Sequence, residues 1–408
     1  MYAIKRELKL NNKETSLMRG QAGFRRWVYN FGLEMVIASW GFEGINLSDA
    51  KRIDTIKQVF TQAVMKQPEY AWMKKYPSTV YQSAFIALKK AFWRWRQGLS
   101  GFPKYQTKKR GDSFTVYKTS GIYPEKGKPA IPFTNRVIIK AGKKIRLPGL
   151  KEFRLKERID FTCSSQTFTV SRTADRWFVS FALDAQKIPP IYHPIERVGV
   201  DIGVKILATA SDGTRYTMPV STKKAKTKLS KLQWRNRHKI LGSKRLRIKA
   251  SNNARRYYVK LAKHHARIGN IRRDTIHKMT TDLSRSVYCI RIEDLNVRGM
   301  MANHKLAGAI SDNCFYEVHR QLVYKQSHYG TLVELVDRWF PSSKTCSGCG
   351  HVQEMKLSDR VFDCQNCDRA IDRDLNASIN LEAAPQEKVR SARPELNACG
   401  QEGAVTLG

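Results

Sequence analysis

Acidic residues are scarce in this sequence, and it contains no long hydrophobic run. Its 408 residues include 35 Asp and Glu against 74 Lys and Arg, so the formal net charge is +39. No apolar stretch approaches the roughly 18 residues of a membrane span, and the N-terminal MYAIKRELKL lacks the apolar core of a signal peptide. We therefore expect no membrane association and a cytoplasmic location.

The excess of cations indicates a polyanionic partner. Like charges at this density destabilise a compact chain unless a polyanion neutralises them, and nucleic-acid backbones release counterions when cations bind. The cations are also concentrated, because residues 213–273 contain no Asp or Glu but twenty Lys and Arg. Hydrophobic residues make up 41% of the chain, which excludes a disordered basic tail and allows two or three domains of about 150 residues.

Cysteine is too scarce and too unevenly spaced for a disulfide framework. Four of the eight cysteines are scattered, whereas the other four form two C-x2-C pairs separated by fourteen residues. The paired residues are Cys346, Cys349, Cys364 and Cys367. This spacing predicts a tetrahedral Zn²⁺ site, and four protein ligands leave no open coordination position, so the zinc is expected to be structural.

Hydrophobic periodicity in the first half predicts helices between β regions. Residues 2–10 alternate in period two and predict a strand, whereas residues 11–98 show apolar positions three and four apart, as in helices. Residues 113–184 return to strand signals, with predicted hairpins that turn at Ala141-Gly142 and at Thr173–Asp175. If the first strand pairs with this later β region, the helical segment is an insertion.

The second half predicts an α/β arrangement. Residues 198–220 predict three short strands with a hairpin at Asp212-Gly213, and the carboxylate-free stretch that follows predicts long helices. Further strands are predicted at 287–296 and 332–340, and a last helix at 373–384. The last 24 residues have few bulky apolar groups, so we expect them to be disordered.

Three carboxylates stand at the ends of these predicted elements. Asp201 lies in the apolar strand VGVDIGV, Glu293 ends the strand CIRIEDL, and Asp374 begins the last helix. A buried charge is costly unless it is paired or bound to metal. Carboxylates that converge from separate elements can hold two Mg²⁺ ions about 3.5–4 Å apart, which activate a water and stabilise the leaving oxygen in phosphodiester hydrolysis. The order strand Asp, hairpin, long insertion, strand Glu and helix Asp is that of an RNase H-like nuclease core.

Each of these acids also has an ordinary interpretation. An Asp in a strand is often a salt-bridge partner, and Asp374 alone is more often a helix N-cap. Asp294, Asp368 and Asp372 lie near enough in sequence to be mistaken for the ligands.

Several motifs in order resemble one protein family. The segments are VGVDIGVKILATASDG, RIEDLNVRGM, AISDNCFYEVHRQLVYKQSHYG, VDRWFPSSKTCSGCG and DRDLNASIN. They closely resemble the TnpB proteins of bacterial and archaeal insertion sequences, which are related to the miniature type V CRISPR effectors. The resemblance runs from about residue 198 to 384, and GFPKY at 101–105 also fits it. Cys314 departs from the family, where an aromatic residue is common at this position.

The resemblance implies an α+β multidomain fold. A helical recognition lobe is inserted in a β-barrel-like wedge domain, and an RNase H-like (RuvC) α/β nuclease domain with an inserted four-cysteine zinc ribbon follows. In the first half, the expected boundaries are 1–10 for the first wedge strand, 11–112 for the helical recognition domain and 113–192 for the rest of the wedge domain. The nuclease domain is expected at 193–340 and 371–384, with a basic helical insertion at 223–280. The zinc ribbon, a target-nucleic-acid-binding module, is expected at 341–370, and a disordered tail at 385–408.

The resemblance also implies a function. It assigns Asp201, Glu293 and Asp374 as the catalytic triad that binds Mg²⁺, expected as two ions, in an RNA-guided DNA endonuclease. Such a protein binds a guide (omega) RNA and recognises a short target-adjacent motif. It cleaves complementary double-stranded DNA, and the DNA that its one RuvC-like site receives is single-stranded. A prokaryotic protein that acts as a monomer with its RNA is expected.

A guide–target heteroduplex of roughly 20 base pairs is held through its backbone, so it requires a long positive channel. The candidate nucleic-acid contacts are Ser78, Gln82, Arg94, Arg96, Lys104, Lys223, Lys224, Arg235, Arg237, Lys244, Arg245, Arg255, Arg256 and Arg272. The alternative for each cation is a solvated helix face, and Trp93 and Trp95 are expected to pack in a core rather than stack on bases.

Three other functions stay open at this point. The first is a miniature type V CRISPR effector with a crRNA guide. The second is an RNA-guided DNA-binding repressor without cleavage, which would require damaged acids or a blocked cleft. The third is a guide-independent RuvC-type nuclease, which would need neither the helical segment nor the first β region.

Overall fold

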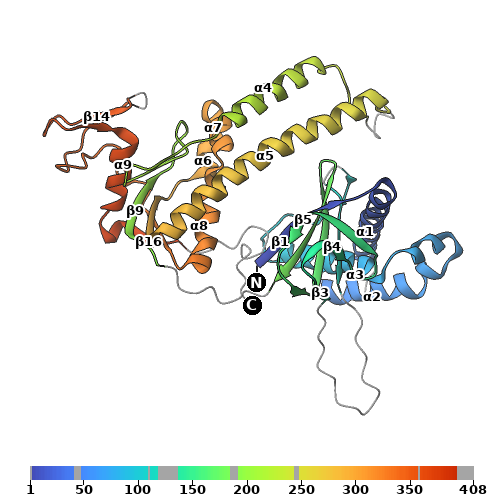
Figure 1. Cartoon of the computed structure of the whole chain (residues 1–408). Helices are drawn as coiled ribbons and strands as arrows, with labels where there is room; N and C mark the ends of the chain where they lie inside the picture. The colour runs from blue at the N-terminus through green and yellow to red at the C-terminus, as the bar shows by residue number, and fades with distance from the viewer. Residues whose placement is uncertain are drawn as a thin grey trace, which may run out of the picture. The chain divides into compact units, whose positions relative to one another are not determined.

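The computed structural model describes residues 2–40, 47–108, 111–117, 137–183, 192–242, 248–356 and 359–392. The chain forms two compact units, Met1–Gln186 and Lys187–Glu395, each with its own strands, helices and hydrophobic core (Figure 1). Within the described residues, no helix combines the length and the apolar character needed to span a bilayer.

The first unit contains a six-stranded sheet with the order β2-β7-β8-β1-β5-β4. Its strands are β1 (Tyr2–Lys9), β2 (Ser113–Tyr117), β4 (Gly142–Arg146), β5 (Glu152–Ile159), β7 (Thr167–Thr173) and β8 (Arg176–Leu183). β1 pairs antiparallel with both β5 and β8, which confirms that the first strand joins the later β region. The sheet is open, because among the described strands β2 and β4 are unpaired edges, so the expectation of a barrel-like domain is wrong.

One of the two predicted hairpins of this unit is correct. β7 and β8 pair across a turn at Ala174, whose φ is 56°. The hairpin predicted at Ala141-Gly142 is wrong, because β3 (Val137–Ile139) pairs with β6 (Cys163–Ser165) and β4 pairs with β5. Gly142, with φ of 142°, lies where the β4–β5 register shifts, so this glycine marks a bulge and not a turn.

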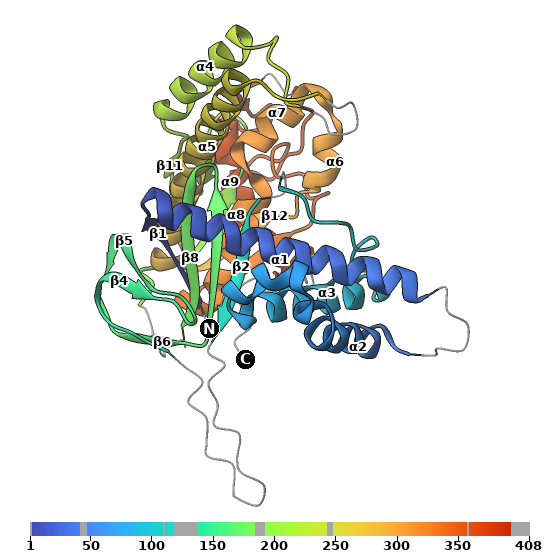
Figure 2. The same ribbon diagram turned by 90° about the vertical axis from the view of Figure 1, so that its right-hand side faces the viewer.

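The helices predicted in residues 11–98 lie between β1 and β2 in the chain. They are α1 (Asn12–Ser39), α2 (Asp49–Gln62) and α3 (Ser78–Arg96), with two short 3-10 helices at Val64–Lys66 and Pro68–Lys75. α1 packs along α3 (Figure 2), and one hydrophobic cluster joins these helices to the sheet. Trp95 packs against Phe102 in this cluster, whereas the side chain of Trp93 is exposed, so the expectation of core packing is correct for Trp95 alone.

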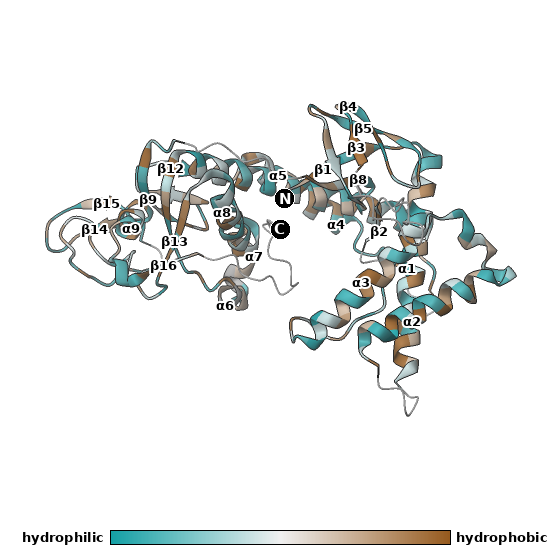
Figure 3. Ribbon diagram, turned by 90° about the horizontal axis from the view of Figure 1, so that it is seen from below, coloured by the Kyte–Doolittle hydropathy of each residue, from teal (hydrophilic) through white to brown (hydrophobic). Residues whose placement is uncertain are grey.

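The second unit contains a mixed sheet with the order β11-β10-β9-β12-β13-β16. Its strands are β9 (Ile195–Asp201), β10 (Ala208–Ala210), β11 (Arg215–Tyr216), β12 (Val287–Glu293), β13 (Leu332–Val336) and β16 (Val389–Ser391). β9, β12 and β13 run parallel, and their buried residues belong to one hydrophobic core. Parts of these strands are brown, the colour of hydrophobic residues, in Figure 3. The strands predicted in 198–220, 287–296 and 332–340 are therefore present.

The expected disorder from residue 385 onward is wrong for the first eight residues of that segment. A 3-10 helix spans Gln386–Lys388, and β16 pairs antiparallel with the edge strand β13. A three-residue edge strand requires little apolar sequence, which explains why the composition carried no signal for it. Residues 393–408 lie outside the described residues.

The second unit also contains helices, some of which contact its strands. They are α4 (Val220–Arg235), α5 (Asn252–Ser286), α6 (Val297–Ala302), α7 (His304–Asn313), α8 (Phe315–Tyr329) and α9 (Arg373–Glu382). α4 and α5 form an extended pair in the basic stretch (Figure 1), which confirms that this stretch is helical and not a tail.

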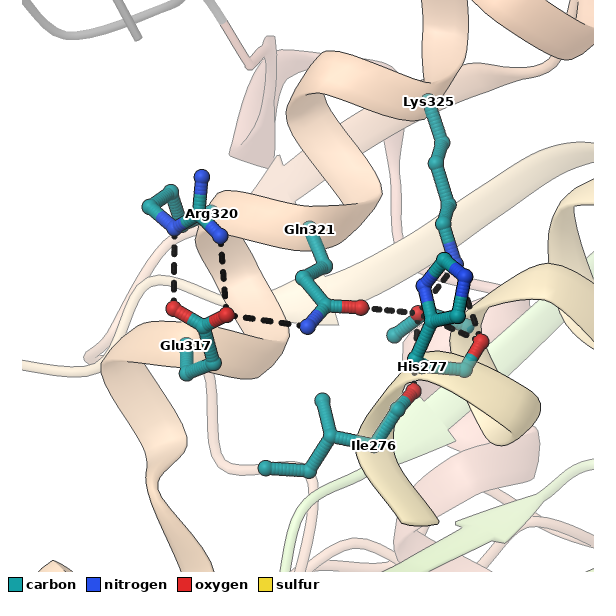
Figure 4. A network of polar contacts seen from close by, with 7 residues as sticks. Ile276, His277, Glu317, Arg320, Gln321 and Lys325 are labelled. Atoms are coloured by element: carbon teal, nitrogen blue, oxygen red, sulfur yellow. Dashed lines mark hydrogen bonds and ion pairs between the residues drawn. The ribbon is translucent and has the colours of Figure 1, made fainter. Parts of the chain in front are cut away.

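A buried lysine fixes α5 on α8. The ammonium of Lys325 donates to the carbonyl oxygen of His277 at 3.0 Å (Figure 4). It also donates to the hydroxyls of Thr280 and Thr281, each at 2.7 Å. Three acceptors match the three donors of an ammonium group, while burial lowers the pKa of Lys325 to about 7. The hydroxyl of Thr280 also donates to Oε1 of Gln321 in α8 at 2.9 Å, so several buried polar contacts attach α5 to α8.

α9 makes direct backbone contact with β9 at Gly199. A Cβ at this position would lie 2.0 Å from the carbonyl oxygen of Ser378 and 2.4 Å from the amide nitrogen of Glu382. Only glycine permits this approach, because both clashing atoms belong to the helix backbone and cannot rotate away.

We expect Gly199→Ala to lower the free energy of unfolding of the second unit by about 2 kcal/mol, because the helix must move off the strand. Gly269→Ala is the matched control: a Cβ at Gly269 in α5 meets nothing within 4 Å, and alanine favours a helix by up to about 1 kcal/mol. Urea denaturation measures both. Equal effects of the two substitutions would contradict the packing argument.

Candidate metal-binding sites

Asp201 and Glu293 stand side by side at the ends of two parallel strands. The β9–β12 register pairs Gly199 with Arg291 and Val200 with Ile292, and its continuation by one residue pairs Asp201 with Glu293. Residues two apart on a strand share a face, and neighbouring strands lie about 4.7–4.9 Å apart. Both carboxylates therefore project from the face of the sheet against which α9 packs at Gly199.

α9 carries the third carboxylate to this position. Asp374 is the second residue of α9. Its Oδ2 lies 4.0 Å from the point that a Cβ on Gly203 would occupy, and Gly203 closely follows β9 in the chain. Asp372 is the N-cap, since its Oδ1 accepts from the backbone N–H groups of Asp374 and Leu375, both at 3.1 Å. The capping role considered for Asp374 thus belongs to Asp372.

The three carboxylates interact electrostatically. Burial raises the pKa of Asp201 to about 7, and the charges of Asp374 and Glu293 contribute to that rise. Burial also raises the pKa of Glu293 to about 7, with a contribution from Asp294. Within the described residues neither Asp201 nor Glu293 has an ion-pair partner, so this group of acids is suited to bind a cation.

Of the neighbouring acids, Asp294 makes ion pairs with two arginines. Asp294 accepts from Arg338 at 3.0 Å and from Arg390 at 2.9 Å, and these bonds lower its pKa although burial acts in the opposite direction. Asp368 has a left-handed backbone, with φ of 55°, in the turn after Cys367. Asp294 and Asp372 therefore have hydrogen-bond partners of their own, although the charge of Asp372 also contributes to the raised pKa of Asp201.

Polar residues hold α9 at both ends, a role that the motifs did not indicate. The buried Asn376 donates to the carbonyl oxygen of Thr345 at 2.7 Å and accepts from the N–H of Ser347 at 2.9 Å, and Asn380 donates to the same Thr345 oxygen at 2.6 Å. At the other end, buried Arg291 donates to the carbonyl oxygens of Glu382 and Ala384 at 2.8 and 2.7 Å. The spacing of the two asparagines by four residues, on one helix face, is the signal that could have identified them.

Arg291 also has a charged partner in the sheet. Its Nε donates to Glu334 of β13 at 2.9 Å, and this pair is largely buried. A guanidinium next to helix C-terminal carbonyls is favoured by the helix dipole. Arg291 and Glu293 lie on the same strand face, so one strand both anchors α9 and supplies a carboxylate to the site.

The four paired cysteines form a compact cluster. Their Sγ atoms all lie within 4.8 Å of one another, and in the described part of the chain this is the only group of three or more metal-ligating side chains so closely placed. Sγ of Cys346 is 3.6 Å from that of Cys367, and Sγ of Cys349 is 3.6 Å from that of Cys364. The hairpin of β14 (Val361–Asp363) and β15 (Ala370–Asp372) carries the second pair, as the spacing predicted.

Hydrogen-bond donors lower the pKa of Cys346 and Cys349, whereas the neighbouring sulfurs of Cys349 and Cys364 raise the pKa of Cys367. The side chain of Asn366 and the backbone N–H of His351 lower the pKa of Cys349 to about 6. The N–H groups of Gly348 and Asn366 also point at Sγ of Cys346 and Cys364, at 3.4 and 3.5 Å. Thiolate sulfurs are the ligands of structural zinc, so these four residues fit a Zn²⁺ ion.

The residues proposed for nucleic-acid contact include some with exposed side chains and some that bind a partner within the chain. Exposed side chains are Ser78, Lys104, Lys223, Lys224, Arg235, Arg237, Arg255 and Arg256. Lys244 and Arg245 lie outside the described residues. Arg94 is half-buried and lines a cavity of about 470 Å³ beside the GFPKY loop.

Three of the predicted contact residues have partners within the chain. Arg272 pairs with Asp312 of α7, which also pairs with Lys226. Arg96 pairs with Asp49 at 2.7 Å. Gln82 accepts from the hydroxyl of Tyr117 at 2.5 Å. Long-range partners that no local pattern reveals therefore make these residues less available for nucleic acid.

Family models match both parts of the candidate region. One that is described as "Probable transposase" (OrfB_IS605) matches residues 180–304, and one that is described as "Cas12f1-like, TNB domain" matches residues 315–381. A Streptomyces pristinaespiralis protein named "Putative RNA-guided DNA endonuclease" is 31% identical over 391 residues, which cover 94% of this chain and 90% of the relative. InsQ of Escherichia coli (strain K12), with the same designation, is 28% identical over 431 residues, with coverage of 97% and 96%.

A solved structure has the same fold. The Cas12f1 chain in a cryo-EM structure of the Cas12f1-sgRNA-target DNA complex aligns with a TM-score of 0.55 at 16% identity. The alignment covers 91% of this chain and 83% of that chain, so the similarity extends over both units.

We expect Asp201→Asn to raise the free energy of unfolding without metal by about 2 kcal/mol at pH 8, because it removes a buried charge that Asp374 and Glu293 repel. Asp294→Asn is expected to lower it by about 1 kcal/mol, since it breaks two ion pairs. Calorimetry in EDTA and in millimolar Mg²⁺ measures both, and Mg²⁺ should stabilise the wild type more than Asp201→Asn. A loss of stability in both variants would show that the charge of Asp201 does not destabilise the metal-free fold, and would contradict a cation site here.

We expect the purified protein to contain one Zn²⁺ per chain and Cys364→Ser to lose it, because three thiolates bind zinc less tightly than four. Cys163→Ser is the control, as this thiol lies on β6 of the first unit and is not a member of the cluster. Elemental analysis after dialysis against a chelator gives the metal content. Zinc retained by Cys364→Ser would exclude the site.

Proposed function

Because this chain belongs to the TnpB family of RNA-guided DNA endonucleases, related to the miniature type V CRISPR effectors, we propose that it cleaves double-stranded DNA directed by a guide RNA. The protein binds a guide (omega) RNA, recognises a short motif beside the target and hydrolyses phosphodiester bonds at one RuvC-like site. The chain spans 90% and 96% of two relatives with this designation, which supports an activity of the whole protein.

The observation that carries this proposal is the group of Asp201, Glu293 and Asp374. Two of these carboxylates lie on the central parallel strands and one on the helix that packs over them, and the pKa values of Asp201 and Glu293 are raised to about 7. The strand order β11-β10-β9-β12-β13 is that of an RNase H-like core, which supports a RuvC-type assignment.

The three carboxylates would hold Mg²⁺, as a pair of ions. The ions supply an activated water and stabilise the leaving oxygen of a phosphodiester. The three carboxylates do not all lie within 4.8 Å of one another, and a pair of ions about 3.5–4 Å apart accommodates such spacing. Asp372, Arg291 and Asn376 act indirectly, because each fixes the helix that carries Asp374.

The remaining regions have proposed roles that follow the family. The helices within 11–112 and the open sheet with its strands in 1–10 and 113–192 form the recognition and wedge regions that bind guide RNA and the target-adjacent motif. The exposed cations of α4 and α5 bind the heteroduplex backbone, which is consistent with the absence of acids from residues 213–273. The zinc-binding cysteine module, residues 341–370, contacts target DNA.

We expect Asp201→Ala to abolish Mg²⁺-dependent cleavage of a target plasmid while the copurified guide RNA is retained, because the side chain binds metal and not RNA. Asp212→Asn is the matched control: Asp212 caps the β10–β11 turn, where it accepts from the N–H of Thr214 at 2.8 Å, and cleavage should persist. Continued DNA cleavage by Asp201→Ala would contradict the assignment of the catalytic triad.

The copurified RNA also separates this function from its alternatives. A defined omega RNA supports the main proposal, and a repeat-derived crRNA supports a CRISPR effector. Binding of target DNA without cleavage by the wild type would support a repressor, and cleavage of branched DNA without RNA would support a guide-independent nuclease.

A further inference from the structure

Trp339 is an unusually exposed aromatic residue on an ordered turn. Its side chain is 84% exposed, although indole burial ordinarily contributes more to stability than that of most side chains. Within the described residues it makes no aromatic contact, whereas the next residue, Phe340, packs on the small core of Val336 and Leu381. The chain therefore buries one of two adjacent aromatics and leaves the other in solvent.

The backbone of Trp339 is held in place. Its N–H donates to Oδ1 of Asp337 at 2.7 Å, and the N–H of Phe340 donates to the carbonyl oxygen of Asp337 at 3.0 Å. The N–H of Asp337 in turn donates to the carbonyl oxygen of Lys388 beside β16 at 2.8 Å. A fixed backbone with an unpacked ring is the arrangement of a preformed contact surface, since little entropy is lost when a partner binds.

This turn lies next to the carboxylate group. Arg338 pairs with Asp294 at 3.0 Å, and Asp294 directly follows Glu293. The N–H of Asp294 also donates to the carbonyl oxygen of Val336 at 2.9 Å. Trp339 thus stands at the same end of the sheet as the acids, and the cysteine cluster begins seven residues later at Cys346.

We propose that Trp339 stacks on a base of the single DNA strand whose phosphodiester lies at Asp201, Glu293 and Asp374, and so positions that strand for cleavage. This inference rests on the proposed function. Stacking on an aromatic ring tolerates every base, because each base has a π-face. A guide-directed enzyme needs this tolerance, since the protein must cut whatever sequence the RNA specifies.

An exposed ring leaves the folded state largely unaffected when it is removed. We expect Trp339→Ala to change the midpoint of urea unfolding very little. It should slow single-turnover cleavage of a guide-matched target about tenfold, which corresponds to about 1.4 kcal/mol. Trp339→Phe should stay within about threefold of the wild type, whereas Trp339→Leu should resemble Trp339→Ala, because leucine is apolar but has no π-face.

The matched control is Tyr288→Ala. Tyr288 is a 47% exposed aromatic on β12, the strand that ends at Glu293, but it lies at the opposite end of that strand. Its removal should leave the cleavage rate unchanged. Equal losses in Tyr288→Ala and Trp339→Ala would indicate a general effect on the sheet and overturn the stacking role.

A second readout does not depend on cleavage. In the Asp201→Ala background, 2-aminopurine placed at successive positions of the displaced and target strands reports stacking through quenching of its fluorescence. We expect quenching at one or two positions that is lost in Trp339→Leu and kept in Trp339→Phe. Quenching that does not depend on residue 339, or full cleavage by Trp339→Ala, overturns this proposal, whereas failure of the wild type to cut overturns the proposed function instead.

Discussion

The direct contact of α9 with β9 is the constraint on which the candidate site depends. Gly199 has no Cβ, so the helix backbone lies against the strand two residues before Asp201. That approach carries Asp374 toward the ends of β9 and β12, where Asp201 and Glu293 stand. A larger residue at 199 would move the helix and the third carboxylate together, even though it would contact neither metal nor substrate.

The acids of the second unit differ in what they do for stability. Asp294 binds two arginines and stabilises the fold, whereas Asp201 and Glu293 lack such partners among the described residues of a chain of net charge +39. Arg373 lies 3.8 Å from Asp374, and its charge only partly offsets the rise in the pKa of Asp201. The raised pKa values of Asp201 and Glu293 express a cost in folding stability that a bound divalent cation would relieve.

The sequence was sufficient for features that depend on local pattern. The strands before Asp201 and Glu293, the spacing of the four cysteines and the helices of 11–98 follow from periodicity and motif. Features that depend on distant partners were missed: Asp312 pairs with Arg272 forty residues away, and Arg291 contacts carbonyls more than ninety residues later. The hairpin predicted at Gly142 was wrong for a related reason. A glycine indicates an unusual backbone conformation but does not tell whether that conformation is a turn or a bulge.

α9 connects the two candidate metal sites, because it carries Asp374 and contacts the loops beside Cys346. β15 runs directly into α9, and Asn376 bonds to both Thr345 and Ser347, on either side of Cys346. A zinc ion held by the four thiolates would fix these loops and, through them, the start of α9 and Asp374. A zinc ion at the four cysteines would therefore order the segment that supports Asp374, the proposed catalytic carboxylate, without itself contacting DNA.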